Sequence, residues 1–263
     1  MNKSQIELQM PGAVPSAPVA ENRMLPAGMG SLKVLVACEE SQEVTKAFRA
    51  LGHDAYSCDT QPCSGGHPEW HIRDSIFHVL CNPLTMFWDL IIAHPPCTFL
   101  TVANTYITRG CSKYTKEEAA EEVRMAKMFF MSLVHSNCER VCIENPIGIM
   151  STEYRKPDQI IQPWQFGHPE SKATCLWLKG LPLLQHTEYA DFKNYRCKCG
   201  NVFPAEYGKY GCCENAAKPL WDNQTKSGQN NLPPSKDRAK LRSKTYPGIA
   251  AAMAMQWGGN ACR

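Results

Sequence analysis

The chain has 263 residues, of which 43% are hydrophobic and 20% are charged, and its formal net charge is +3. These values are typical of a globular protein with one substantial domain, or one domain that carries a small insertion. The charge is compatible with a nucleic-acid partner but does not indicate one. No apolar run approaches the roughly 18 residues that a membrane-spanning helix needs, so we expect no membrane association.

Fourteen residues are cysteines, which is a high number for this length. The chain does not open with the charged and apolar segments of a secretory signal, so we expect a cytoplasmic protein in a reducing compartment. There, thiols serve as core residues, metal ligands or nucleophiles. A disulfide scaffold is the alternative interpretation.

Residues 1–30 are predicted to be a disordered leader, because prolines and glycines interrupt any periodicity. Residues 32–38 (LKVLVAC) form a short continuous apolar run, which is typical of a strand buried on both faces. A helix is expected between Ser41 and Gly52, with its apolar residues on one side. Residues 54–58 (DAYSC) predict a second strand that ends at Asp59.

Two further strands are predicted, at residues 88–93 (WDLIIA) and 140–143 (RVCI). Between them, Thr115 and Glu118 have the spacing of a capping box, and apolar residues follow at helical intervals. Strands that alternate with helices predict an α/β fold with a doubly wound, mostly parallel sheet. Ligands of such sheets bind outside the carboxyl ends of the strands.

Polar and reactive residues gather where these predicted strands end. They are Cys38, Glu39, Glu40 and Ser41 after the first strand, Asp59 after the second, His94-Pro95-Pro96-Cys97 after the third, and Glu144-Asn145-Pro146 after the fourth. Turns alone would explain the prolines. They do not explain a thiol after a double proline with a Glu-Asn-Pro sequence at the neighbouring strand end.

The segment 88–104 (WDLIIAHPPCTFLTVAN) resembles the catalytic motif of DNA cytosine-C5 methyltransferases, in which a strand leads into Pro-Pro-Cys-Gln-x-Phe-Ser. Glu144-Asn145-Pro146 is similar to the Glu-Asn-Val motif of that family. The resemblance spans roughly residues 32–180 and is specific around Cys97 and Glu144. It implies the Rossmann-like fold of methyltransferases that depend on S-adenosylmethionine, with DNA as substrate.

The resemblance also implies roles for individual residues. Cys97 would be the nucleophile that adds to C6 of the base, which makes C5 reactive toward a methyl group, and Glu144 would interact with N3. The base would have to be flipped out of the duplex. Asn145 and Lys172 are the other predicted catalytic residues, and Lys172 lies within residues 167–174, the counterpart of the Gln-x-Arg-x-Arg motif. At the cofactor, Asp59 would bind the ribose and Asp74 would face the adenine. The other predicted cofactor residues are Cys38, Glu39, Glu40, Ser41 and Pro95.

The sequence departs from the family at several points. The glycines of the Phe-x-Gly-x-Gly turn are absent, Thr98 replaces glutamine and Pro146 replaces valine. Two alternatives therefore stay open. One is a related pyrimidine-C5 transferase that acts on RNA or a free nucleotide, or transfers a group other than methyl. The other is a non-catalytic relative that only binds DNA.

Four thiols within 17 residues predict a structural zinc site formed by Cys197, Cys199, Cys212 and Cys213. Unligated thiols and a redox role are the alternatives, and His186 is a possible substitute ligand. The surrounding segment, residues 186–232, alternates basic and aromatic residues and lies where the family has its target-recognition region. A solvated loop held by the metal is the other interpretation.

The predicted organisation is a catalytic domain at 31–185, the Cys-rich insertion at 186–232, and a C-terminal segment at 233–263 that completes the cofactor pocket. The basic run 236–242 (KDRAKLR) is expected either to contact phosphates or to face solvent. The compact size resembles that of phage-encoded and mobile-element enzymes. This implies a monomer in the cytoplasm of a bacterium or of a phage-infected host.

Overall fold

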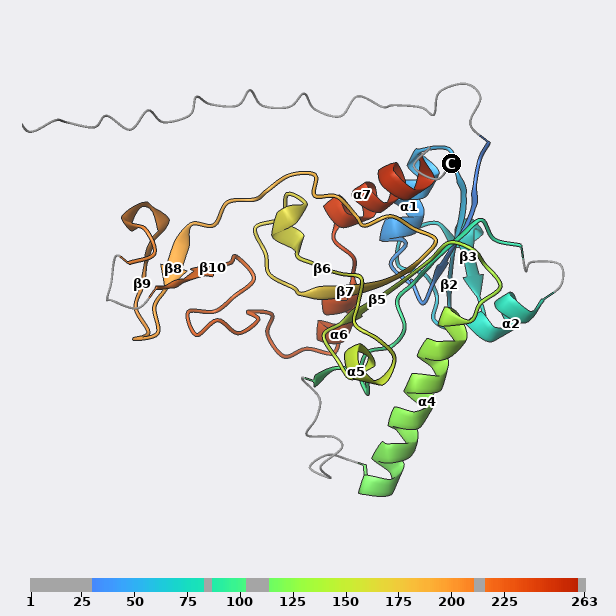
Figure 1. Ribbon diagram of the computed structural model, residues 1–263, viewed down its shortest axis with the longest axis horizontal. Coiled ribbons are helices and arrows are strands. Elements are labelled where there is room, and N and C mark those ends of the chain that lie inside the picture. Colours follow the sequence, from blue (N-terminus) through green and yellow to red (C-terminus); the bar gives the residue numbers. More distant parts are fainter. Residues whose placement is uncertain (1–29, 83–86, 103–113, 211–215, 260–263) are drawn as a thin grey trace, which may run out of the picture.

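The computed structural model of the chain describes residues 30–82, 87–102, 114–210 and 216–259, as Figure 1 shows. The predicted leader at residues 1–30 therefore lies almost entirely outside the described residues. None of the helices in these ranges combines the length and apolar character that crossing a membrane requires.

A central sheet of seven strands organises the molecule, in the order β3-β2-β1-β4-β5-β7-β6. The strands β3, β2, β1, β4 and β5 are parallel, whereas β7 is antiparallel to both of its neighbours. Their bounds are β1 Lys33–Ala37, β2 Asp54–Asp59, β3 His71–Arg73, β4 Leu90–Ala93, β5 Val141–Pro146, β6 Gln159–Ile161 and β7 Thr174–Lys179. The predicted α/β class with a mostly parallel sheet is confirmed.

Helices cover both faces of this sheet, which is why its central strands are apolar on both sides. On one face, α1 (Glu43–Ala50) and α7 (Pro247–Gly258) share a core with alternate residues of β1. On the other face, α4 (Lys116–Val134) packs Phe130 and Leu133 over the remaining residues. The shorter helices are α2 Ile76–Cys81, α5 Met150–Glu153 and α6 Arg238–Ser243, with 3-10 turns at Pro68–Trp70, Pro163–Gln165 and Ala205–Tyr207.

The capping box predicted before α4 is present. The Thr115 hydroxyl accepts a hydrogen bond from the backbone N–H of Glu118 at 3.1 Å, and the Glu118 carboxylate accepts one from the N–H of Thr115 at 2.8 Å. Two backbone donors that would otherwise lack a partner are thereby satisfied.

The fourth predicted strand is longer than its apolar run. β5 continues through Glu144 and Asn145 to Pro146, because β7 pairs with it antiparallel, with Glu144 opposite Leu176 and Asn145 opposite Cys175. The apolar pattern stops at Ile143, so it contains no signal for this extension. The Glu-Asn-Pro motif thus lies inside a strand and is held rigidly.

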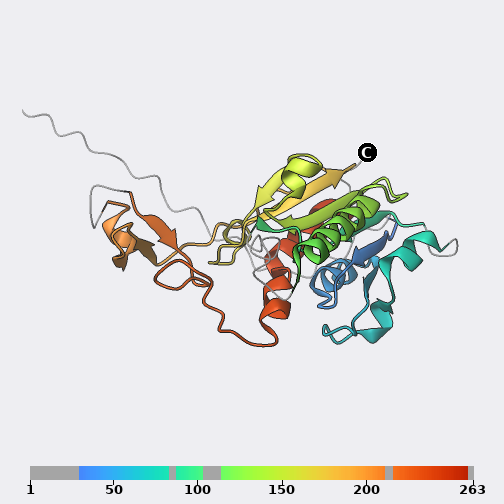
Figure 2. The same cartoon turned by 90° about the horizontal axis from the view of Figure 1, so that it is seen from below.

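A second, three-stranded antiparallel sheet stands apart from the central one, as both views show (Figures 1 and 2). It consists of β8 (Asn194–Arg196), β9 (Val202–Pro204) and β10 (Lys218–Leu220). We call it the β8–β10 lobe. Trp221 after β10 stacks on Trp164 of the larger part of the molecule, with ring centroids 5.6 Å apart and planes inclined by 7°.

Candidate active site

Three neighbouring parallel strands bring the predicted catalytic and cofactor residues to one edge of the sheet. β1 lies beside β4, and β4 lies beside β5 in parallel register. The turn from Cys38 to Ser41, the segment from His94 to Cys97, and Glu144 on β5 therefore emerge at the same edge. This is the arrangement that the sequence predicts.

His94 and Glu144 form an ion-pairing contact at the centre of this edge. His94 Nδ1 lies 3.0 Å from Glu144 Oε2, and the two side chains are only 9% and 14% exposed. Burial alone would raise the pKa of Glu144. The hydrogen bond from His94 and the nearby charges of Lys172 and His94 outweigh burial, so that the pKa of Glu144 is lowered. Glu144 is thus held as a carboxylate.

Cys97 lies in the turn that follows β4, where its carbonyl oxygen accepts hydrogen bonds from Leu100 and Thr101 at 3.0 and 2.9 Å. The thiol is partly buried. Burial, followed by the negative charge of Glu144, raises its pKa, while the charge of Lys172 acts in the opposite direction. The charge of Glu144 therefore reaches the Cys97 thiol.

Asn145 and Lys172 form hydrogen bonds to backbone carbonyl groups. The buried Asn145 side chain donates a hydrogen bond to the carbonyl oxygen of Pro95 at 2.8 Å, which ties the double-proline segment to β5. Pro95 is itself buried. Lys172, just before β7, donates to the carbonyl oxygen of Lys244 at 3.3 Å. Asn145 thus positions the backbone that carries Cys97.

Two residues in the turn after β1 have positive φ angles, which are more usual for glycine, although neither is glycine. Cys38 and Gln42 have φ angles of 61° and 59°. This left-handed region costs an ordinary residue about 1–2 kcal/mol. The N–H groups of Cys38 and Glu39 both donate to the carbonyl oxygen of Cys58, at 2.7 and 3.2 Å, which fixes the turn. Backbone strain of this kind accumulates at functional sites.

Glu39 occupies the N-terminus of α1. Its carboxylate accepts hydrogen bonds from the backbone N–H groups of Val44 and Thr45 at 2.6 and 3.2 Å, and from the Thr45 hydroxyl at 2.7 Å. Burial raises the pKa of Glu39, although these bonds and the charge of His94 act against it. A phosphate group cannot use this helix N-terminus, because a carboxylate of the chain already fills it.

Glu40 is the least satisfied residue of the turn. Neither of its buried carboxylate oxygens accepts a hydrogen bond from any described residue. Lys240 of α6 supplies a charge 3.3 Å from one of them. The neighbouring Ser41 is buried as well. Glu40 is therefore available to accept hydrogen bonds from a ligand.

Asp59 and Asp74 follow the adjacent strands β2 and β3. Asp59 accepts a hydrogen bond from the N–H of Gln61 at 2.9 Å, and Asp74 accepts bonds from the N–H of Ser75 and from His78 at 2.6 and 2.8 Å. Burial, with both aspartates contributing, raises the pKa of the Cys58 thiol to about 12. The charges of both carboxylates therefore reach the Cys58 thiol at the end of β2.

Half of the predicted zinc site can be located. Cys197 is buried and Cys199 is exposed, in the turn between β8 and β9. Cys212 and Cys213 lie outside the described residues. Among the residues that are described, no three His, Cys, Asp or Glu side chains gather in a way that would hold a metal ion. The zinc site stays a prediction.

The aromatic residues of the insertion divide into two groups. Phe192 packs edge-on against both Tyr195 and Trp221, with ring centroids 4.9 and 5.4 Å away. Tyr207 and Tyr210 are instead 65% and 60% exposed. The first group packs within the lobe, whereas the second, like Tyr189 at 63%, is exposed to solvent. His186 contacts Tyr189 through a hydrogen bond.

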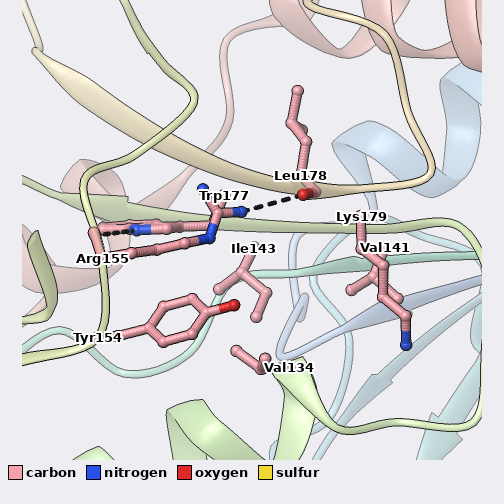
Figure 3. A pocket seen from close by; sticks show the side chains of 8 residues that line it. All are labelled: Val134, Val141, Ile143, Tyr154, Arg155, Trp177, Leu178 and Lys179. Carbon is pink, nitrogen blue, oxygen red and sulfur yellow. Dashed lines mark hydrogen bonds between the residues drawn. The ribbon is translucent and has the colours of Figure 1, made fainter.

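A surface pocket lies elsewhere. It has a volume of 180 Å³ and is lined by residues such as Val134, Val141, Tyr154 and Trp177 (Figure 3). Val141 begins β5, so this pocket lies toward the amino end of the strand, whereas Glu144 lies toward the other end. None of the predicted site residues lines it. We do not assign the chemistry to this pocket.

The sequence analysis assigned no role to His94. This residue stands directly before the double proline, but its contact with Glu144 depends on the pairing of β4 with β5, which the sequence does not reveal.

Comparison with protein-family models and with curated proteins found no match. The functional assignment therefore depends on the motifs and on the geometry of this edge.

Proposed function

We propose that the chain is a methyltransferase that depends on S-adenosylmethionine and methylates C5 of cytosine in DNA. The observation that carries the proposal is that Cys97 and Glu144 lie at the carboxyl ends of the neighbouring parallel strands β4 and β5. The charge of the carboxyl group reaches the thiol, at the ligand-binding edge of the sheet.

The chemistry assigns a separate task to each residue. Cys97, once it has lost its proton to solvent, adds through its sulfur to C6 of the pyrimidine, and the ring electrons become available at C5. Glu144 holds a proton at N3 and stabilises the charge that develops on the ring. When C5 has been substituted, its proton passes to a solvent water molecule, the electrons of the C5–H bond restore the C5–C6 double bond, the C6–S bond breaks, and the Cys97 thiolate leaves.

The turn after β1 suits a cofactor of this kind. S-Adenosylmethionine supplies an electrophilic methyl group on a sulfonium and brings no phosphate to bind. The helix N-terminus that would hold a phosphate is filled by Glu39. Glu40 offers to an ammonium group two buried carboxylate oxygens that accept no hydrogen bond from the described residues, although Lys240 lies 3.3 Å from one of them. Asp59 and Asp74 would offer acceptors to hydroxyl and amino groups.

The sheet order also supports the proposal. The first five strands have the spatial order 3-2-1-4-5 of doubly wound nucleotide-binding sheets. The antiparallel β7 between β5 and β6 is what we expect of the methyltransferase fold. The β8–β10 lobe, with exposed Tyr207 and Tyr210, would then contact the DNA.

The test is covalent trapping. Duplex DNA of randomised sequence with 5-fluorocytosine in place of cytosine is incubated with the protein and S-adenosylmethionine, and adducts are resolved on a denaturing gel. Fluorine at C5 cannot leave as a proton, so the C6–S bond persists. We expect an adduct with the wild type and with Cys81→Ala, which removes an exposed thiol, and none with Cys97→Ala.

Two further arms address the alternatives. RNA and free nucleotides that carry the same fluorinated base are tested as acceptors, and an adduct with these alone would assign a different substrate. Calorimetry measures the affinity for S-adenosylmethionine. A chain that binds DNA but neither binds this cofactor nor forms an adduct would be the non-catalytic relative, and the proposal would be wrong.

A further inference from the structure

His94 directly follows β4, and buried carboxyl groups lie at the ends of the strands on either side of it, Glu39 after β1 and Glu144 on β5. Its Nδ1 is 3.0 Å from Glu144 Oε2. Its charge also acts on Glu39, in the turn after β1. The ring is 9% exposed, and its Nε2 is buried without a hydrogen-bond partner among the described residues.

The other charged residues around His94 are Glu39, Lys172 and Arg242. Glu39 is satisfied by α1 through Val44 and Thr45. Lys172, from the segment before β7, acts on Glu144 and on Cys97, and Arg242 of α6 acts on Cys97. His94 is therefore the titratable group that Glu144 contacts directly.

The proposed reaction creates a requirement that Glu144 alone does not meet. A carboxyl group can donate a hydrogen bond to N3 only while it carries a proton. In the free protein the cationic neighbours lower the pKa of Glu144, although burial acts against them. A proton must therefore reach Glu144 when the base is attacked, and the group that can supply one through an existing contact is His94.

We propose that His94 and Glu144 share one proton and that His94 is the positioning residue that delivers it to Glu144. The inference rests on the proposed function. The pair carries one proton between His94 Nδ1 and Glu144 Oε2. As the Cys97 sulfur bonds to C6, this proton passes through Glu144 to N3, which leaves a carboxylate beside a neutral imidazole. On elimination of Cys97, N3 returns the proton to the pair, and the proton of C5 passes to a solvent water molecule.

The first measurement is the pH profile of methyl transfer under single-turnover conditions, for the wild type and His94→Gln. Glutamine can donate a hydrogen bond to Glu144 but cannot supply a proton. We expect the rate at pH 7 to fall about 100-fold, and the decline on the alkaline side to begin at lower pH. His135→Gln, an exposed histidine at the end of α4, is the matched control and should behave as the wild type.

The second measurement needs neither DNA nor cofactor, so it does not depend on the proposed function. Glutamate carboxyl groups are labelled with carbon-13, and the Glu144 signal is identified by its loss in Glu144→Gln. NMR then follows its titration. We expect His94→Gln to move the midpoint to higher pH, because burial is then opposed by fewer positive charges.

The outcomes separate the two proposals. Two results would overturn the shared proton and show that His94 only packs against Glu144. One is a methyl-transfer rate that His94→Gln lowers by the same factor at every pH. The other is a Glu144 titration midpoint that His94→Gln leaves unchanged. Absence of methyl transfer in the wild type, with a shifted Glu144 titration in the variant, would overturn the proposed function and keep the coupled pair.

Discussion

The charge of Glu144 influences the protonation of Cys97. Burial and the Glu144 charge both disfavour the Cys97 thiolate. Cys97 of the free protein is therefore held mostly as a thiol, and a change that neutralises Glu144 should favour the thiolate. This effect can be probed without any substrate.

Alkylation of Cys97 by iodoacetamide should therefore depend on pH in a defined direction. The rate should rise with pH and reach its midpoint above about 8.5, the ordinary value for a cysteine. Glu144→Gln should move the midpoint down, because one of the two causes of the raised pKa is removed. Mass spectrometry of the Cys97 peptide measures this. The exposed Cys81 serves as control and should not respond to Glu144→Gln; an unchanged Cys97 midpoint would contradict the influence of Glu144 on this thiol.

Glu144 should also make the stability of the fold dependent on pH. Its pKa in the folded chain is below its value in the unfolded chain, despite burial, because of His94 and Lys172. Its contribution is therefore present above about pH 4.3, the unfolded value, and is lost as the pH falls through the folded pKa. Urea unfolding should find Glu144→Gln less stable than wild type at pH 7, and the two should converge in acid. A constant difference would be inconsistent with this linkage.

At the scale of elements, the short helix α1 depends on a residue outside it. Gln42 at its N-cap provides no side-chain cap. Glu39 satisfies the first N–H groups instead, from the strained turn after β1. One carboxylate thus fixes the start of a helix and the shape of the turn that we assign to the cofactor.

Glu39→Ala should lower the free energy of unfolding by about 1–2 kcal/mol, because it leaves buried N–H groups without an acceptor. Glu43→Ala is the matched control. Glu43 is also at the start of α1 but pairs only with Lys46 at 3.4 Å, and its loss should change stability by less than about 0.5 kcal/mol. Chemical denaturation measures both. Equal effects would show that Glu39 is not the cap.

At the scale of the whole molecule, the β8–β10 lobe is joined to the larger part through aromatic rings. Trp164 and Trp221 are stacked, and Phe192 packs edge-on against Trp221. Such ring pairs contribute about 0.5–1.5 kcal/mol beyond their buried area. The orientation of the lobe toward a DNA substrate would depend on this contact.

Trp221→Ala should loosen the lobe while the central sheet stays folded. A loss of about 1 kcal/mol corresponds to a roughly fivefold larger population of the open form, and limited proteolysis within residues 186–232 should accelerate by about that factor. Affinity for S-adenosylmethionine should be retained. Tyr207→Ala, an exposed ring of the same lobe, should leave proteolysis unchanged. Loss of cofactor affinity in Trp221→Ala would show that lobe and core are not separable.

The sequence predicts much of the fold because local patterns and burial agree over the central strands. The apolar runs that become β1 and β4 are buried on both faces, so they show in the sequence as continuous hydrophobic segments. The capping box before α4 is a local motif and was found for the same reason. β3, β6 and β7 were not predicted. Two of these are only three residues long, and β7 is specified by its pairing with β5 and β6.

The amino-acid sequence by itself determined the residue types at the strand ends, including Cys97 after the double proline and Glu144 on the next strand, because neighbouring residues carry those signals. Only the tertiary structure decided which of them meet. His94 faces Glu144, Asn145 ties down Pro95, and Glu39 caps α1. The contacts of His94 and Asn145 join residues 50 positions apart. They arise from the parallel pairing of strands, which leaves no periodic trace in the chain.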